Sequence, residues 1–128
     1  MNNIEKFVNA LISINADDKL MINKDDFFYN NEIKNIVSYY KFDESCKDNL
    51  YCFANHILKI KNKKLQKLSE LFNRINDCDL IFVNVRDARE PKIEYICNLF
   101  IRYLLSDISY KKFNRYLLIL QNLNVNRL

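Results

Sequence analysis

Apolar side chains recur every three or four residues along most of the chain, which is the spacing of one face of an α-helix. The pattern predicts helices over residues 4–12, 25–40, 45–61 and 65–75. Asp25 or Asp26 is expected to cap the second helix, and Asn62 and Lys63 to break or kink the chain before the fourth. Each helix has a polar face opposite the apolar one, so we expect each to lie at the surface with one face buried.

Residues 80–85 are the one β-rich run, with the sequence Leu-Ile-Phe-Val-Asn-Val. Periodicity alone fits a strand, an extended loop or a helix over so short a stretch. Because no second clear strand is available to pair with it, a strand here would leave its backbone groups without hydrogen bonds. We therefore expect a buried connector or a helix.

The best-marked helix start lies just after this run. Asp87 with Glu90 three residues later fits a capping box, and Pro91 would sit in the first turn, where its missing N–H costs nothing. The helix that follows, near 88–105, is apolar on nearly every side in its second half. Such a helix is usually the central one of a bundle.

A last helix is expected to begin at Ser109, and it has more apolar residues than one buried face needs. The surplus residues are Leu118, Ile119 and Leu123. A chain of 128 residues is long enough to close one core but not two. The sequence therefore predicts an all-α fold, a compact bundle of about six helices with a central apolar helix near 88–105, in a single domain over residues 1–128.

The composition excludes several kinds of site. The chain contains no Gly, one Pro and no Trp. Glycine supplies positive φ in tight turns, so its absence disfavours hairpin architectures and leaves the turns to Asn and Asp. A P-loop, a Rossmann fingerprint, a nucleophile elbow and a calcium-binding helix-loop-helix each need glycine at a fixed place, and all four are excluded.

Charge is distributed unevenly along the chain. Residues 1–50 hold 6 basic and 9 acidic side chains, net −3, whereas residues 51–128 hold 14 basic and 7 acidic, net +7. The basic residues form two clusters, one of Lys59, Lys61, Lys63, Lys64, Lys67 and Arg74 and one of Lys111, Lys112 and Arg115. Such faces are suited to nucleic-acid phosphates, which they bind by releasing counterions, and equally to steering an acidic protein partner.

Tyrosine is abundant for a chain of this length, with 8 residues. Because tyrosine is enriched at protein interfaces, the excess indicates a protein partner or self-association. The alternative is that these tyrosines lie at the edge of the core with hydrated hydroxyls. The sequence favours neither interpretation over the other.

Reactive side chains give little sign of an active site. His56 stands four residues after Cys52, so the two share a helix face and can reach one metal ion. A structural zinc site needs four ligands in tight local pairs, and no second pair is present. A Cys–His dyad would also need an oxyanion hole and an orienting group. We therefore expect no enzyme activity, no catalytic residue, no metal and no cofactor.

Acidic pairs occur where helices are predicted to end or begin, at Asp17/Asp18, Asp25/Asp26, Asp43/Glu44 and Asp77/Asp79. Carboxylates there favour the positive end of the next helix dipole, so capping accounts for them. One further charged cluster consists of Arg86, Asp87, Arg89 and Glu90. It could form a metal-dependent nuclease centre, but the capping box explains the same residues.

The cysteines and the N-terminal segment indicate the cellular compartment. Cys46, Cys52, Cys78 and Cys97 are irregularly spaced, and polar residues interrupt the N-terminal segment where a signal peptide would be continuously apolar. No stretch approaches the roughly 18 apolar residues of a membrane span. These features predict free thiols in a reducing cytoplasm and no membrane span.

The segment from Glu90 to Leu128, a third of the chain, resembles a helix-turn-helix-shaped module of uncharacterised proteins from bacteria and mobile elements. The resemblance lies in Ile93, Ile96, Leu99, Phe100, Tyr103, Leu104, Ile108, Ser109, Phe113, Arg115, Ile119 and Leu120, and it implies no activity. The helix order is also similar in outline to the Bcl-2-like inhibitors of poxviruses, although the chain lacks the Asn-Trp-Gly-Arg signature of cellular Bcl-2 relatives.

Together these features predict a non-enzymatic helical protein-binding module, an inhibitor or adaptor from a virus, phage or mobile element, with self-association as one form of binding. The alternative is a nucleic-acid-binding protein that uses the basic faces at 59–74 and 111–115.

Overall fold

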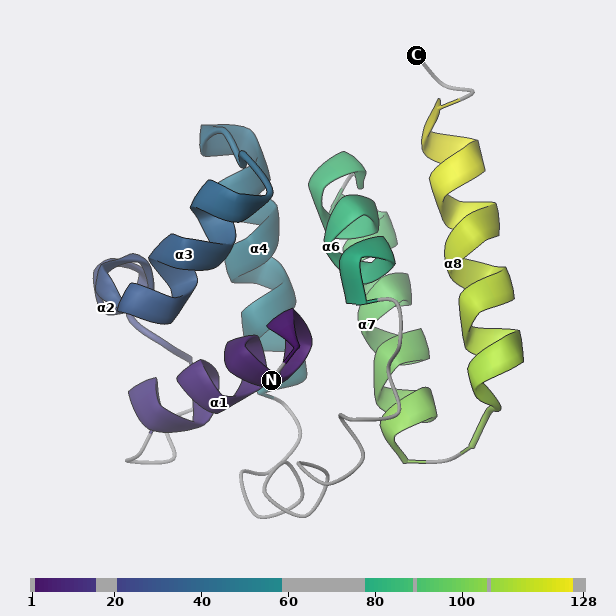
Figure 1. Ribbon diagram of the computed structural model, residues 1–128, viewed down its shortest axis with the longest axis horizontal. Coiled ribbons are helices and arrows are strands. Elements are labelled where there is room, and N and C mark those ends of the chain that lie inside the picture. The colour runs from purple at the N-terminus through teal and green to yellow at the C-terminus, as the bar shows by residue number, and fades with distance from the viewer. Residues whose placement is uncertain (1, 16–20, 59–77, 89, 106, 126–128) are drawn as a thin grey trace.

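The computed structural model (Figure 1) describes residues 2–15, 21–58, 78–88, 90–105 and 107–125, without the side chains of Cys78, Glu90, Leu104 and residues 123–125. Within these ranges there are seven helices and no strand, which confirms the predicted all-α fold. The helices are α1 (Asn3–Ile14), α2 (Lys24–Tyr29), α3 (Asn31–Tyr39), α4 (Glu44–Ile57), α6 (Cys78–Asp87), α7 (Glu90–Leu104) and α8 (Tyr110–Val125). The helix predicted over 65–75 lies outside the described residues.

The helices form two groups that meet in the middle of the molecule. Figure 1 shows α1, α2, α3 and α4 at one end and α6, α7 and α8 at the other. Helix α4 packs against both α6 and α7, and α8 packs against α6 and α7 at the far edge. The central helix predicted near 88–105 is α7, which contacts α4, α6 and α8, and α6 shares this central position because it also contacts α1.

One hydrophobic core joins the two groups. Its largest members are fully buried phenylalanines from α1, α2, α4, α6, α7 and α8, namely Phe7, Phe27, Phe53, Phe82, Phe100 and Phe113. The ring of Phe53 stacks on Phe7 with 5.6 Å between centroids and lies 5.9 Å from the ring of Phe100. Phe53 therefore connects the core of the first group to that of the second.

Asparagine side chains begin three helices of the first group. Asn2, Asn23 and Asn30 are the N-caps of α1, α2 and α3, and each accepts first-turn N–H groups at 2.9–3.2 Å. Asp43 caps α4 in the same way. An N-cap oxygen satisfies N–H groups that have no acceptor inside the helix. Part of the asparagine content thus has a structural role.

The single helix predicted over residues 25–40 is wrong, because the segment forms two helices that meet at Asn30. Asn30 has an extended backbone with ψ of 133°, and its carboxamide accepts two N–H groups of α3. These local hydrogen bonds compete with those of a continuous helix. The N-cap of α2 is Asn23 rather than Asp25 or Asp26, which lie in the first turn.

Residues 80–85 belong to α6, so the helical alternative for this run is correct. Ile81, Phe82 and Val85 are fully buried. Their burial follows from the position of α6, which packs against α1 and α4 of the first group and against α7 and α8 of its own. The nearly continuous apolar run reflects this position rather than a strand.

The predicted capping box is wrong at its first residue. Asp87 is the last residue of α6, and its Oδ1 accepts a hydrogen bond from Arg86 Nε at 3.1 Å. Helix α7 starts at Glu90, so Asp87 lies too far upstream to be its N-cap. Pro91 is in the first turn of α7, as predicted.

Lys41 has a φ of 55°, and it is the one non-glycine residue with positive φ in the described ranges. It follows the end of α3, where its N–H donates to Ser38 O at 3.2 Å and the Phe42 N–H donates to Val37 O at 3.0 Å. This arrangement of bonds at a helix C-terminus favours glycine. Because the chain has no glycine, a lysine occupies the left-handed position instead of the Asn or Asp that the composition suggests.

Lys41→Gly is expected to raise the free energy of unfolding by about 0.5–1 kcal/mol, because glycine removes the steric cost of the left-handed conformation. A larger unfolded-state entropy offsets part of the gain. Urea denaturation followed by circular dichroism measures the change. Lys34→Gly, inside α3, is the matched control and should lose about 1 kcal/mol. Destabilisation by both changes would show that Lys41 is not strained.

Asp43 is expected to make α4 sensitive to acid. The Cys46 N–H that its carboxylate accepts at 2.9 Å holds the Asp43 pKa below its ordinary value of 3.8. A group whose pKa is lower in the folded than in the unfolded state stabilises the fold above the unfolded pKa, and this contribution is lost as pH falls through the folded pKa. Asp43→Asn keeps a capping oxygen without the charge. Its melting temperature should lie below that of the wild type at neutral pH and approach it below pH 3.8. A constant difference at all pH values would contradict this.

Candidate protein-interaction surface

Helix α8 begins at Tyr110, directly after Ser109, where the sequence predicts a helix start, and the Ser109 side chain caps its first turn. Ser109 Oγ accepts the Lys112 N–H at 3.2 Å, and the Ser109 carbonyl accepts the Phe113 N–H at 2.9 Å. Phe113, Leu117 and Leu120, spaced four and three residues apart, are buried. They form the face that attaches α8 to the bundle.

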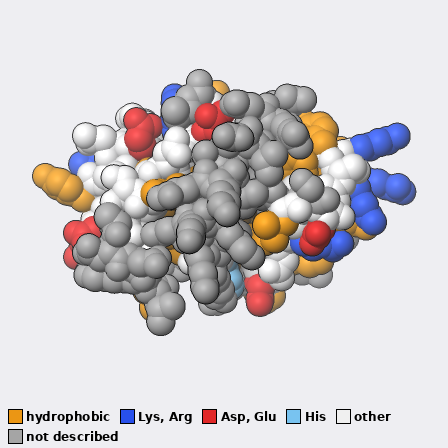
Figure 2. Space-filling model, turned by 90° about the horizontal axis from the view of Figure 1, so that it is seen from below, with side chains coloured by type: hydrophobic (Ala, Val, Ile, Leu, Met, Phe, Trp, Pro, Cys, Tyr) orange, Lys and Arg blue, Asp and Glu red, His pale blue; other side chains and the backbone are white. Residues whose placement is uncertain are grey.

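The opposite side of α8 is exposed. We define the α8 outer face as Lys111, Arg115, Leu118, Ile119 and Asn122, all of which are exposed to solvent. Leu118 and Ile119 are 50% and 47% exposed, although apolar side chains of this size are usually buried. Figure 2 shows Lys and Arg side chains gathered at the end of the molecule where α8 lies. The face therefore combines positive charge with exposed aliphatic surface.

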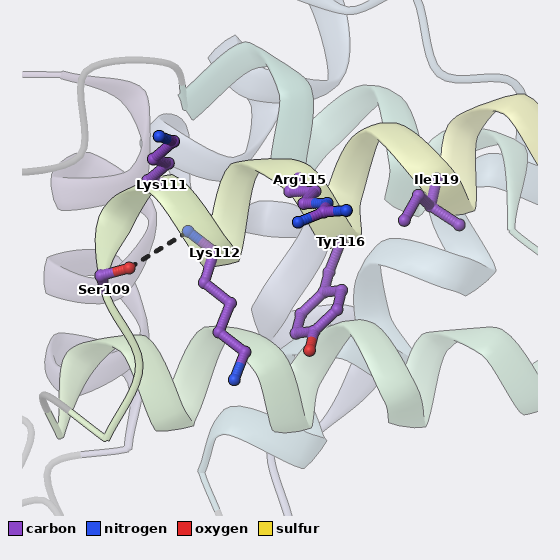
Figure 3. Close-up of a pocket in the computed structure, with 6 residues that line it drawn as sticks. All are labelled: Ser109, Lys111, Lys112, Arg115, Tyr116 and Ile119. Carbon is purple, nitrogen blue, oxygen red and sulfur yellow. Dashed lines mark hydrogen bonds between the residues drawn. The ribbon is translucent and has the colours of Figure 1, made fainter.

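Two depressions flank this face. One, of about 500 Å³, is lined by Ser109, Lys111, Lys112, Arg115, Tyr116 and Ile119 (Figure 3). The other, of about 700 Å³, is lined by Tyr110, Lys111, Asn114, Arg115, Leu118, Ile119 and Asn122. Both are bordered by Lys111, Arg115 and Ile119, which follow each other at intervals of four residues and form a ridge between them. A partner that contacts the ridge would fill the hollows on either side.

The side chains of Lys112 and Tyr116 extend together on one side of the ridge in Figure 3. The ammonium group of Lys112 lies 5.9 Å from the centre of the Tyr116 ring, within the range of a cation–π contact. Tyr116 is half-buried and packs against the core. Lys112 is thus held beside the first depression.

Three of the predicted basic residues, Lys111, Lys112 and Arg115, line one depression. The other six, Lys59, Lys61, Lys63, Lys64, Lys67 and Arg74, lie outside the described residues. The sequence also indicated the apolar part of the face, because Leu118 and Ile119 exceed what the buried face of α8 needs. It did not indicate that the charged and apolar groups share one face.

The tyrosines divide between the two interpretations that the sequence left open. Tyr40 is buried and donates to Asp79 Oδ1 at 2.5 Å, and the half-buried Tyr51 donates to the Ile22 carbonyl at 2.5 Å. These two are core-edge residues with bonded hydroxyls. The exposed tyrosines are Tyr29, Tyr39 and Tyr95, at 79%, 66% and 49%.

Comparison with protein-family models, with curated proteins and with solved structures finds no match to this chain. The functional interpretation therefore rests on the side chains themselves. In the described part of the chain, no helix has the length and apolarity of a membrane span.

The reactive side chains of the described residues do not converge on a recognisable centre. Cys52 and His56 are both half-buried on α4, and no group of three or more His, Cys, Asp or Glu within the described residues is placed to hold a metal ion. Cys46 and Cys97 donate to backbone carbonyls at 3.5 and 3.8 Å. Burial raises the pKa of the Cys46 thiol above its ordinary value of 9.0, which keeps it protonated at neutral pH.

Two buried amide oxygens lie on helices that pack against each other. Asn84 of α6 is completely buried, and its Nδ2 donates to the Leu80 carbonyl at 2.9 Å, but its Oδ1 accepts no hydrogen bond from a described residue. The Oδ1 of Asn114 on α8 is likewise buried and has no hydrogen-bond partner among the described residues. Each unsatisfied acceptor opposes folding by its lost hydration.

Proposed function

We propose that this protein is a non-enzymatic helical binding module that acts in the cytoplasm as an inhibitor or adaptor, and that the α8 outer face binds its protein partner. The observation that carries the proposal is the pair of exposed aliphatic side chains, Leu118 and Ile119, beside Lys111 and Arg115 on one helix face. Interface cores combine apolar groups with arginine, whereas isolated surface helices normally present polar groups.

Nucleic-acid binding is the second candidate, and the three cations around one depression favour it. A phosphate-binding surface gains most of its affinity from the number of cations that displace counterions. The centre of the α8 outer face is aliphatic, and the sequence from residue 110 to 125 contains no aromatic side chain other than Tyr110, Phe113 and Tyr116 on which exposed bases would stack. Phe113 is buried and both tyrosines pack against the core, so the surface supports a protein partner better.

A photo-crosslinking residue in place of Ile119 tests this proposal in cells that express the protein naturally. Irradiation should give a discrete adduct that protease destroys and nuclease does not. The same residue in place of Ser13, which is exposed on α1, is the matched control and should give no such adduct. An adduct that nuclease removes would favour the nucleic-acid candidate, and equal labelling from both positions would reject the α8 outer face as a specific site.

A second variant distinguishes binding through the aliphatic side chains from binding by charge alone. Leu118→Ser with Ile119→Ser, combined with a crosslinker at Asn122, removes the aliphatic centre but keeps the charges. The adduct should then be lost, because binding by charge alone is weak and screened at physiological salt. Persistence of the adduct at full yield would show that the aliphatic pair does not contribute.

A further inference from the structure

At the opposite end of the molecule a second surface has the complementary chemistry. We define the α2 surface as Asp25, Asp26 and Tyr29, all exposed. Tyr29 is three and four residues after the two aspartates, so the three side chains project from one side of the helix. Tyr29 is 79% exposed, the largest value among the exposed apolar side chains in the described ranges. Neither carboxylate forms an ion pair with another described residue.

The two surfaces have opposite charges and side chains that can pack on each other. The α8 outer face offers two cations beside branched aliphatic groups, and the α2 surface offers two carboxylates beside an aromatic ring. The ammonium group of Lys34 already lies 4.6 Å from the centre of the Tyr29 ring, so this ring accepts a cation within the molecule. Arg115 is suited to the same ring from outside, since guanidinium groups stack on aromatic faces and pair with carboxylates.

The position of the two surfaces prevents them from meeting within one molecule. Helices α2 and α8 lie at opposite ends of the bundle (Figure 1), and Figure 2 shows the basic side chains at the α8 end. No contact between α2 and α8 is among the helix pairs that pack in the described structure. The only way for the surfaces of this chain to pair is between two copies.

We propose that the α8 outer face of one molecule binds the α2 surface of a second copy, head to tail. This inference rests on the proposed function and names its partner. In the contact, Lys111 and Arg115 face the carboxylates of Asp25 and Asp26, and the Tyr29 ring packs on the exposed aliphatic pair. Because the two surfaces differ, the contact leaves one of each free and continues into a chain or a closed ring, rather than ending at a two-fold dimer.

The association is expected to be weak and sensitive to salt. Helix α8 has 16 residues, or about 24 Å of length, so one of its faces buries less than the roughly 800 Å² per partner of a standard stable interface. Charge pairs at the rim act mainly on association and are screened at about 0.15 M salt. Oligomers should therefore form at high protein concentration and low salt.

Two variants that each lose one surface give a direct test by sedimentation velocity. The α8 variant carries Lys111→Glu and Arg115→Glu, and the α2 variant carries Asp25→Asn, Asp26→Asn and Tyr29→Ser. At a concentration and salt where the wild type forms oligomers, each variant alone should be monomeric. Their equimolar mixture should form a dimer and nothing larger, because one intact α2 surface meets one intact α8 outer face and no further pair exists.

Control variants separate the contact from net charge and from folding. Lys41→Glu with Arg102→Glu changes the net charge of +4 by the same amount as the α8 variant, at exposed positions outside both surfaces, and should oligomerise like the wild type. Tyr29→Ser alone leaves the charges of α2 in place and should weaken association by about tenfold. Circular dichroism melting identifies any variant that has lost its fold.

Three outcomes would overturn the head-to-tail contact. The first is a wild type that stays monomeric at low salt, and the second is an α2 variant that still dimerises alone, which would indicate a two-fold contact through α8. The third is oligomerisation that nuclease treatment abolishes, which would assign it to bound nucleic acid. A monomeric wild type that still gives the Ile119 adduct in cells would remove this inference and keep the proposed function.

Discussion

Phe53→Ala is expected to lower the free energy of unfolding by about 3–5 kcal/mol. The ring is completely buried between Phe7 of α1 and Phe100 of α7, and α4, which carries it, packs against both α6 and α7. Its removal leaves a cavity where the two groups of helices meet, and the surrounding helices are able to close it only in part. Since domains of this size are commonly stable by 5–15 kcal/mol, the variant should be barely folded.

Urea denaturation monitored by far-ultraviolet circular dichroism measures this loss, and the absence of tryptophan makes the helical signal the natural reporter. Tyr29→Ala is the matched aromatic control. Its side chain is 79% exposed, so the free energy of unfolding should change by less than about 0.5 kcal/mol. Similar losses from both variants would mean that the junction between the two groups does not depend on the phenylalanine stack.

Asn84→Leu is expected to have the opposite effect and raise the free energy of unfolding by about 1–2 kcal/mol. Leucine has the same branching at Cγ as asparagine, so it fits the buried space of α6 without the unsatisfied amide oxygen. The hydrogen bond that Nδ2 donates to the Leu80 carbonyl is lost, but a helical carbonyl at this position also has a backbone N–H as partner. Removing the unsatisfied amide oxygen therefore stabilises the fold by more than the loss of the Nδ2 hydrogen bond destabilises it.

Asn84→Asp is the control for this prediction. It keeps the shape of the side chain but places a carboxylate where the exposed fraction is 0%, so it should cost about 3 kcal/mol or more at neutral pH. The cost should shrink in acid, because the neutral acid needs no charge partner. We expect the free energy of unfolding to be highest for Asn84→Leu, lower for the wild type and lowest for Asn84→Asp. Destabilisation by leucine would show that the Asn84 oxygen has a partner in solution.

Much of the architecture could be predicted from periodicity. The apolar stripes of the first, third and last helices pack into the core, as Phe7, Phe53 and Phe113 illustrate. Periodicity does not decide whether residues 80–85 are helical, because a helix buried on most sides loses the polar face that reveals its period. Only its packing against α1, α4, α7 and α8 decides between the alternatives.

Helix ends were harder to predict than helices. Asn30 divides one periodic segment in two because its side chain captures N–H groups, and an apolar pattern carries no sign of that capture. The predicted capping box at Asp87 is wrong for a different reason, since α6 continues through Asp87, a residue that is equally suitable as a helix cap. Lys41 shows a third limit, because its left-handed conformation accompanies the hydrogen bonds that end α3 and is not favoured by lysine itself.

The residues of the candidate surface could be predicted from the sequence, but their position together on one helix face could not. The basic residues and the surplus leucine and isoleucine of the last helix were evident in the sequence. Their convergence on one face follows from which residues the bundle buries, namely Phe113, Leu117 and Leu120. Tyr29 gave no sign of its exposure, because tyrosines at the core edge and at the surface have the same local pattern.

The two orphan amide oxygens have a consequence for how the fold opens. Helix α8 is at the edge of the bundle, and it and its neighbour α6 each bury an acceptor that water would satisfy once the helices separate. Detachment of α8 as a unit therefore lets water reach both amide oxygens, and local opening should occur here before global unfolding. A partner that recognises only the attached helix would suppress this opening and stabilise the whole chain in proportion to its concentration.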